Sequence, residues 1–155
     1  MNKKTYYLAY GSNLSTEQMA VRCPDAMVAG KAVLKDWKLA FKYHADIIPC
    51  EGELVQVLVW QISEQDEENL DYYEGFPHYY RKKLMNVTMT DFNGDHPEEI
   101  TAMVYVMSEE NDRLRMPAKG YYDVLANAYR KLWFDERYLQ RALLESIDSQ
   151  REEHP

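Results

Sequence analysis

The order of apolar and polar residues predicts a chain rich in strands. Runs of β-branched and aromatic residues, either uninterrupted or alternating with polar residues, are typical of buried and half-buried strands. Such runs occupy residues 5–10, 27–41, 54–62, 79–90 and 100–107, with 27–41 forming one strand or two. Between them, residues 44–52 predict a loop or a bent sheet edge, because Pro49 has no N–H to donate to a neighbouring strand.

Two helices are indicated by the residues that cap them. Ser15, followed three residues later by Gln18, predicts a helix that ends before Pro24. Ser63 predicts a second helix that runs through Tyr73, and the Gly-Phe-Pro that comes soon afterwards prevents its continuation.

The last third of the chain predicts two further helices, one after Pro117 and one over residues 136–147. We expect residues 1–148 to form a single domain and residues 149–155 to form a frayed polar tail. Hairpin and crossover connections are mixed along the chain. This order predicts an α+β fold, with a small, mixed, barrel-like sheet and flanking helices.

Composition limits the classes of function. The 155 residues carry a formal net charge of −8, which argues against a nucleic-acid partner because phosphate binding needs clustered cations. Cys23 and Cys50 are isolated, so neither a zinc site nor a disulfide framework is expected. No apolar run approaches the length of a membrane span or of a signal peptide, so we expect a cytoplasmic protein that does not bind membranes.

Glu74 is the strongest candidate for catalysis. It stands at the predicted end of the second helix and has aromatic neighbours on both sides, namely Tyr72, Tyr73, Phe76, Tyr79 and Tyr80. Exclusion of water and the negative end of a helix dipole both raise the pKa of a carboxyl group. A raised pKa would suit Glu74 to act as a general base near neutral pH, although most glutamates at helix ends are surface residues.

Other readings of this region stay open at the level of sequence. Asp71 shares a helix face with Glu74 and would either raise the pKa of Glu74 by repulsion or pair with Arg81. A Cys50 nucleophile activated by His44 or His78 is a weaker alternative. The glycine turn that follows the first strand is either an anion-binding loop or a plain strand-to-helix turn.

These segments together resemble the γ-glutamylcyclotransferase family, which includes the AIG2-like proteins. Residues 7–14 (YLAYGSNL) resemble the family's YGSNL signature, and Leu-Asp-x-x-Glu-Gly is matched at residues 70–75. Tyr80 and Arg81 fit the next part of the pattern, and Pro117 with Tyr121 fits a Pro-x-x-x-Tyr helix start. The matches occur in the family's order and cover roughly residues 5–130.

The resemblance implies a fold, a reaction and a set of site residues. The implied fold is a small α+β domain built around a β-barrel. The implied reaction is the intramolecular aminolysis of a γ-glutamyl amide, without a cofactor, which releases 5-oxoproline and an amine or amino acid. Glu74 would be the base and then the acid, and Tyr121 would bind the glutamyl group. The remaining substrate-binding residues would be Tyr7, Leu8, Ala9, Tyr10, Gly11, Ser12 and Asn13.

Two positions depart from the family's pattern. Val57 replaces a frequent glycine and would narrow the pocket if its side chain pointed inward, and Ala118 replaces the serine of a Pro-Ser pair. A catalytically silent protein of the same fold, which binds a small molecule or a partner protein, is therefore the alternative function. The resemblance implies a small-molecule γ-glutamyl substrate and leaves a homodimer open.

Overall fold

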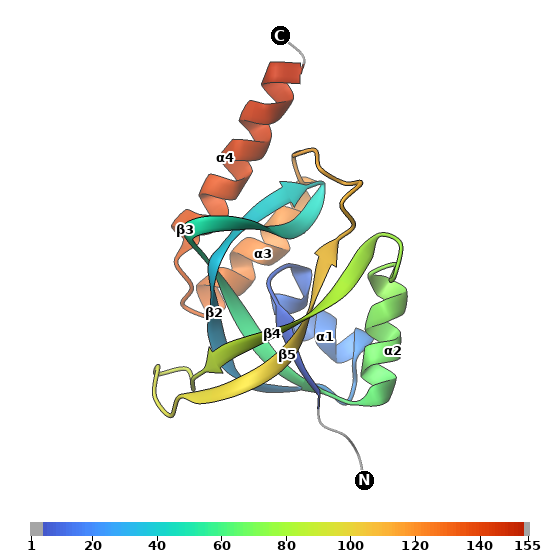
Figure 1. The fold of residues 1–155 in the computed structure, drawn as a ribbon, viewed down its shortest axis with the longest axis vertical. Coiled ribbons are helices and arrows are strands. Elements are labelled where there is room, and N and C mark those ends of the chain that lie inside the picture. Colours follow the sequence, from blue (N-terminus) through green and yellow to red (C-terminus); the bar gives the residue numbers. More distant parts are fainter. Residues whose placement is uncertain (1–4, 154–155) are drawn as a thin grey trace.

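The structure is a computed structural model that describes residues 5–153, and it has the predicted α+β architecture (Figure 1). Strands and helices follow one another without division into separate units. The strands are β1 (Thr5–Ala9), β2 (Met27–Lys42), β3 (His44–Ile62), β4 (Tyr80–Met89) and β5 (Glu98–Met107). The helices are the 3-10 turn η1 (Ser12–Leu14), α1 (Thr16–Arg22), α2 (Glu64–Tyr73), α3 (Lys119–Lys131) and α4 (Glu136–Glu153).

The short strand β1 lies at the centre of a five-stranded sheet with the order β2-β3-β1-β5-β4. It runs antiparallel to β3, where Tyr7 pairs with Trp60, and parallel to β5, where Tyr7 pairs with Met103. The chain leaves the end of β1 directly into η1 and α1. The motif residues that follow β1 therefore lie at the end of the central strand, next to η1 and α1.

Residues 44–52, expected to form a loop or a bent sheet edge, belong to the sheet, because β3 starts at His44 and continues through this segment. The loop alternative is therefore wrong. β2 and β3 form one long hairpin in which Pro49 pairs with Trp37, next to an irregularity in the register. β1 pairs with β3 only over residues 58–62, so β1 does not cover the outer edge of β3 near Pro49. A proline is tolerated at such an edge, since no ladder there requires its missing N–H.

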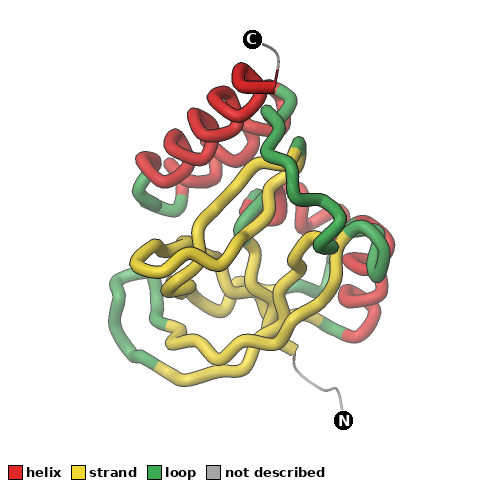
Figure 2. Tube along the Cα trace, turned by 45° about the horizontal axis from the view of Figure 1, so that its top comes forward, coloured by secondary structure: helices red, strands yellow, loops and turns green. Residues whose placement is uncertain are grey.

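The sheet curves like a barrel but does not close (Figure 2). Its edge strands β2 and β4 meet at a single bridge within the described residues, where Lys31 and Thr90 exchange two backbone hydrogen bonds of 3.0 and 2.9 Å. Gly30 makes this approach possible, since a Cβ at this position would overlap the carbonyl oxygen of Thr90 and lie 2.9 Å from Met89 Cγ.

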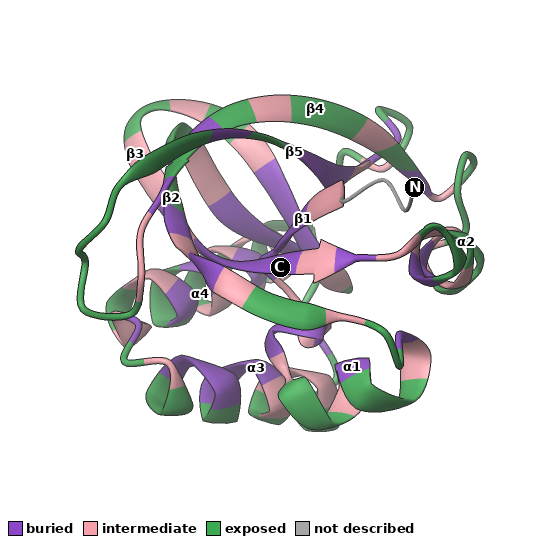
Figure 3. Ribbon diagram, turned by 90° about the horizontal axis from the view of Figure 1, so that it is seen from below, coloured by how far each residue is buried: buried purple, intermediate pink, exposed green. Residues whose placement is uncertain are grey.

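The helices cover one side and one end of the curved sheet, with α1 and α3 on the same side (Figure 3). α2 begins with a complete capping box between Ser63 and Asp66, as the sequence predicts. α4 packs against β2 and continues to Glu153, so the predicted helix end at Ile147 and the frayed tail after it are wrong over the described residues. The last two residues of the predicted tail lie outside the described part of the chain. Within residues 5–153, no helix has the length and apolar character that a membrane crossing requires.

Candidate active site

Glu74 is the C-cap of α2, and the residues around it end the helix in a fixed geometry. Gly75 follows in the left-handed conformation, with a φ of 63°. The N–H of Phe76 donates to the carbonyl of Asp71 (2.9 Å), and the N–H of Gly75 donates to the carbonyl of Tyr72 (3.3 Å). This is the Schellman arrangement that glycine favours at helix ends. This arrangement holds the backbone of Glu74 rigidly, while the Glu74 side chain points toward the start of η1.

Asn13 is the residue that receives the Glu74 carboxylate. Asn13 is 2% exposed, and its Nδ2 donates to Glu74 Oε1 (3.2 Å) and to the hydroxyl of Tyr7 (2.9 Å). Its Oδ1 accepts from Gln18 Nε2 (3.0 Å) and from Arg22 Nη1 (3.2 Å). All four hydrogen-bonding positions of the amide are thus in use, which fixes its orientation. Glu74 Oε2 accepts no hydrogen bond from residues 5–153.

Burial is the main electrostatic influence on Glu74. It raises the pKa of this carboxyl group to about 7, against the smaller lowering effects of the Arg22 charge and of the Asn13 hydrogen bond. The expectation that Asp71 raises this pKa is wrong, because Asp71 is not among its causes. Asp71 instead accepts a hydrogen bond from the Tyr105 hydroxyl (2.7 Å) and pairs with Lys82 (2.9 Å) rather than with Arg81.

The rings that exclude water from Glu74 come mostly from distant parts of the chain. Among its neighbours in sequence, the expected aromatic surround forms only in part. Tyr72 is 83% exposed and points away, whereas Tyr73, Tyr79 and Tyr80 line the outer space beside Glu74. A small cavity beside Glu74 is instead lined by aromatic residues from β1, β4, β5 and α3 together with the loop after β1. These aromatic residues are Tyr7, Tyr10, Tyr80, Tyr105 and Tyr121.

Two cavities meet at Glu74. The inner one, with about 30 Å³, is lined by the five tyrosines, by Gly11–Asn13 and by Ala45. The outer one, with about 340 Å³, opens between the end of α2 and the start of α3. Ser12, Glu74, Tyr80 and Tyr121 line both. Glu74 therefore stands at the junction of a space of about one water molecule and a space of ligand size.

Hydrogen bonds hold the tyrosines of the inner cavity in place. Tyr10 donates to the carbonyl of Tyr105 and Tyr80 donates to the carbonyl of Ala45, both at 2.6 Å. Tyr121 accepts from the N–H of Ala45 (3.0 Å), and a Cβ on Gly11 would lie 3.2 Å from its hydroxyl. The glycine of the YGSN loop thus leaves room for the tyrosine that approaches from α3.

Comparison with known proteins identifies the family of this chain. The family described as gamma-glutamyl cyclotransferase, AIG2-like, matches residues 7–124. The chain belongs to this family. A gamma-glutamylcyclotransferase of Mus musculus is 27% identical over 147 residues, which cover 87% of this chain and 75% of the mouse protein.

Solved structures of the same family share the fold. One described as a gamma-glutamyl cyclotransferase has a TM-score of 0.77 and 25% identity, over 90% of this chain and 86% of that one. An AIG2-like protein from Mus musculus, 18% identical, has a TM-score of 0.56 over 72% of this chain and 84% of that one. The second likeness concerns the fold alone.

Most residues that the family resemblance indicates come together in this structure. Tyr7, Tyr10–Asn13 and Tyr121 line the inner cavity with Glu74, whereas Leu8 and Ala9 are buried in the core and line neither cavity. Val57 is also fully buried and lines neither, so its side chain does not narrow them. Tyr7 lines the inner cavity and Leu8 does not, because they are successive residues of β1 and successive side chains of a strand point to opposite faces of the sheet.

The alternative site, with Cys50 as a nucleophile activated by a histidine, does not form. Cys50 lies on β3 and lines neither cavity, while His44 lines the outer one and is bonded to the hydroxyl of Tyr79 through Nδ1 (2.9 Å). Burial lowers the pKa of His44, with a further contribution from Arg115, which keeps the imidazole neutral at pH 7. Within residues 5–153, no three His, Cys, Asp or Glu side chains group as metal ligands.

Sequence reasoning did not identify the supporting residues Gln18, Arg22 and Tyr105. Arg22 lies nine positions after Asn13, in the last turn of α1, and only the turn through η1 brings its guanidinium back to Asn13. Tyr105 reaches the site from β5 through the parallel pairing with β1. No local pattern in the sequence marks such contacts.

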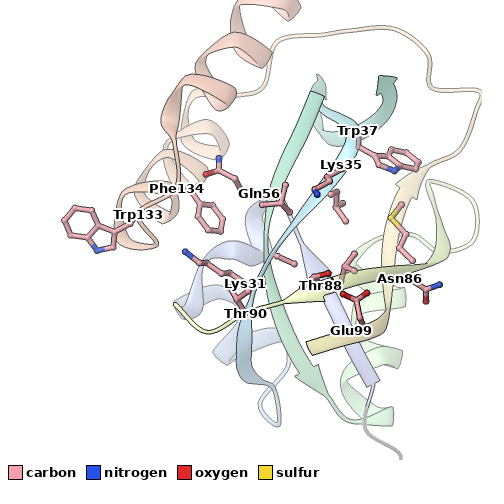
Figure 4. A pocket seen from close by; sticks show the side chains of 15 residues that line it. Lys31, Lys35, Trp37, Gln56, Asn86, Thr88, Thr90, Glu99, Trp133 and Phe134 are labelled. Carbon is pink, nitrogen blue, oxygen red and sulfur yellow. Dashed lines mark hydrogen bonds between the residues drawn. The ribbon is translucent and has the colours of Figure 1, made fainter. Parts of the chain in front are cut away.

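A larger cavity of about 720 Å³ lies elsewhere, at the unclosed seam between β2 and β4. Trp133 and Phe134 stand on one side of it, and Asn86, Thr88 and Glu99 on the other (Figure 4). None of the family motif residues lines this space, and the one carboxylate in its lining, Glu99, is hydrogen-bonded to Thr88. The smaller pair of cavities at Glu74 is therefore the candidate active site.

Proposed function

We propose that this chain is a γ-glutamyl cyclotransferase that converts a γ-glutamyl amide into 5-oxoproline and a free amine or amino acid. The observation that carries the proposal is the Glu74 carboxyl group, which lies buried beside the YGSN loop. Its burial raises its pKa to about 7. A binding protein has no need of such a group. An acid–base catalyst works best with a pKa close to the working pH.

The substrate supplies the nucleophile. Its α-amine can close a five-membered ring on its own γ-carbonyl carbon, so proximity is already provided within one molecule. At pH 7 this amine is mostly an ammonium, with a pKa of about 7.7–8.0. Glu74, with a pKa of about 7, accepts its proton at a small free-energy cost, and the uncommitted Oε2 is the atom that receives it.

Protons balance between the two nitrogens. The new bond joins the α-nitrogen to the γ-carbonyl carbon, and the bond from that carbon to the amide nitrogen breaks. The α-nitrogen loses two protons as the ammonium becomes the lactam N–H, and the leaving nitrogen gains two as it departs as an ammonium. Glu74 alternates between base and acid in these transfers, so no residue of the protein needs to become acylated.

The inner cavity suits the oxygen that becomes negative during ring closure. The hydroxyls of Tyr7 and Tyr121 each accept one hydrogen bond, from Asn13 and from Ala45, which leaves their own O–H protons to donate. Both line a space of about 30 Å³. Donors that are fixed before the reaction stabilise a developing oxyanion without reorganisation. The loop Tyr10–Asn13 would bind the α-carboxylate of the glutamyl group beside it.

The test is to incubate the purified protein with γ-glutamyl-alanine, γ-glutamyl-ε-lysine and glutathione and to measure 5-oxoproline. We expect turnover of at least one of them, and a loss of about 10²–10⁴-fold in Glu74→Gln, which keeps the shape of the side chain but cannot accept a proton. Circular dichroism and thermal unfolding establish that the variant is folded.

Two results would contradict the proposal. If none of the three substrates yields 5-oxoproline, the chain is a silent binding protein of this fold. If Glu74→Gln retains the full rate, the reaction does not use Glu74 as its base.

A further inference from the structure

The seam cavity, the space of about 720 Å³ between β2 and β4, has the size of a small-molecule site. It exists because the two edge strands meet at one bridge, Lys31 with Thr90, and no further ladder joins them within residues 5–153. Its floor is apolar and consists of the buried side chains of Ala32, Leu34 and Val87.

Large apolar side chains remain exposed around this floor. Trp133 is 93% exposed and Val33 is 42% exposed, and both line the cavity. Figure 4 shows Trp133 and Phe134 on one side of the space and Trp37 at the other end. A group of exposed apolar residues around one cavity is typical of a binding site rather than of an ordinary surface.

The indole of Trp133 is held at the edge of the cavity by a strained backbone. Its φ of 58° is left-handed, the conformation that glycine usually adopts after the end of a helix. The N–H of Phe134 donates to the carbonyl of Tyr129 (2.9 Å), which ends α3 in a Schellman turn. The side chain of Gln56 accepts from the N–H of Asp135 (2.7 Å) and donates to its carbonyl (3.2 Å), so the turn is fixed against β3.

Two lysines give the seam cavity an excess of positive charge. Lys31 and Lys35 line it, and neither forms a salt bridge with a carboxylate of residues 5–153. They alternate with Val33 along β2, so the three side chains share one face of the strand. The one acid of the lining, Glu99, is hydrogen-bonded to Thr88. On a chain with a net charge of −8, this grouping favours an anionic ligand.

An extended peptide fits the same seam poorly. Addition of a strand needs a regular free sheet edge. The register of β2 is interrupted between Lys35 and Trp37, where Asp36 has a φ of 66°. Lysines and irregularities at a sheet edge also oppose the pairing of a further strand. A small ligand requires no such ladder.

We propose that the seam cavity is a second ligand site, which binds a small carboxylic acid with an apolar body. The carboxylate lies between the ammonium groups of Lys31 and Lys35, and the apolar body covers Val33 and packs against Trp133 and Phe134. Burial of apolar surface supplies affinity, and the lysines select the anion. The residues of this site line neither cavity at Glu74, so the site is independent of the proposed cyclotransferase function.

A matched pair of probes tests the site. 4-Phenylbutyrate and 4-phenylbutyramide have the same apolar body and differ in charge. In ¹H–¹⁵N spectra of the protein, we expect 4-phenylbutyrate to shift the indole N–H signals of Trp37 and Trp133 in a saturable way. The signal of Trp60, which donates to the carbonyl of Asn13 at the active site, should not move. The acid should bind about tenfold more tightly than the amide, as for a hydrogen bond to a charged group.

Variants separate recognition of the charge from burial of the apolar body. Lys31→Gln combined with Lys35→Gln should bring the two probes to the same affinity, because only the acid loses its partners. Lys119→Gln is the matched control, since this lysine lies outside the cavity lining, and it should keep the preference. Trp133→Ala should weaken both probes by a similar factor, about tenfold for the loss of an aromatic contact.

Several results would overturn the second site. These are the absence of saturable binding, equal affinity of the wild-type protein for acid and amide, a shift of the Trp60 signal alone, and displacement of 4-phenylbutyrate by γ-glutamyl-alanine. Sedimentation as a dimer that Trp133→Ala dissociates would make this face an interface between two copies of the chain. Tighter binding of an acidic peptide that alternates glutamate and valine would indicate strand addition instead. Each of these outcomes excludes the small-ligand site and leaves the cyclotransferase proposal unaffected.

Discussion

Asn13 connects the YGSN loop to Glu74, the proposed base. Gln18 and Arg22 hold its amide oxygen from α1, which turns the amide nitrogen toward Glu74 and Tyr7. A hydrogen bond to the charged form of a carboxyl group lowers its pKa, so Asn13 opposes the effect of burial. Burial, the Arg22 charge and this hydrogen bond together leave the pKa of Glu74 at about 7, where the group can both accept and return a proton.

The first prediction concerns the pH dependence of activity. Because Glu74 has to be ionised to act as a base, kcat/KM should fall about tenfold for each pH unit below its pKa of about 7. Above about pH 8 the rate should fall again, since the free amine no longer carries the proton that the leaving group requires. Initial rates between pH 5 and 9 measure both limbs, and a rate that stays constant down to pH 5 would contradict the assigned role.

The second prediction concerns stability. The pKa of Glu74 is raised in the folded chain, so ionisation destabilises the fold, and this cost is absent below the unfolded value of 4.5 and complete above about 7. Glu74→Gln should therefore raise the free energy of unfolding by up to about 3 kcal/mol at pH 8 and by only about 1 kcal/mol at pH 5. Urea unfolding of both proteins at the two pH values gives the difference. No gain at pH 8 would show that the carboxylate is not desolvated.

At this scale the sequence indicates Glu74 as the candidate base but does not indicate its surroundings. Glu74 is recognisable from the helix end and the family motif. Of the rings close to it in sequence, Tyr72 projects into solvent, whereas Tyr80 lines the inner cavity. The rings that desolvate it, such as Tyr105, arrive through strand pairings between distant segments, which no local spacing encodes.

Among the elements, α3 carries Tyr121 into the site but begins without a side-chain cap. Ala118 has the extended backbone of an N-cap, with φ −63° and ψ 146°, and makes no capping hydrogen bond. This is one of the two positions at which the chain departs from the family's pattern. The departure leaves the Tyr121 hydroxyl in its bond to Ala45 and weakens only the helix start.

The third prediction follows from the missing side-chain cap of α3. Ala118→Ser should increase the free energy of unfolding by about 1 kcal/mol, because its hydroxyl oxygen can accept from the free N–H groups of the first turn. Ala118→Val adds a side chain without an acceptor and serves as the control. The same stability for the serine and valine variants in chemical denaturation would show that this helix start does not limit stability.

Sequence patterns predicted most helix and strand boundaries closely, except for the end of α4 and the start of β3. Ser63 and the Gly-Phe-Pro break define α2, because capping is a local interaction. The segment around Pro49 was predicted as a loop or a bent sheet edge and belongs to β3, because whether a proline is tolerated depends on which side of the strand has a neighbour. That neighbour lies elsewhere in the chain. The register of β2 against β3 is likewise a property of the sheet.

At the scale of the whole molecule, the two edges of the curved sheet meet at the bridge between β2 and β4. Gly30 is required there because the two backbones approach without room for a Cβ. We expect Gly30→Ala to lower the free energy of unfolding by about 1–3 kcal/mol, the usual cost of overpacking.

Gly120→Ala provides the control for this fourth prediction, since a Cβ at that position meets nothing within 4 Å. It should leave stability unchanged or raise it slightly, as alanine favours a helix over glycine. Chemical denaturation followed by fluorescence compares the two. If Gly30→Ala costs less than about 0.5 kcal/mol, the range of an ordinary surface substitution, the bridge contributes little to the fold.

The central place of β1 affects how the chain is made. Tyr7 pairs with Trp60 on one side and with Met103 on the other, so the strand that leaves the ribosome early completes its second ladder only after 96 further residues, 103 minus 7, have been added. At about 5–20 residues per second this takes on the order of 5–20 s. During that time β1, an apolar strand that carries part of the candidate active site, has one unpaired edge. The two cavities at Glu74 can therefore form only late in synthesis, once β5 has paired with β1.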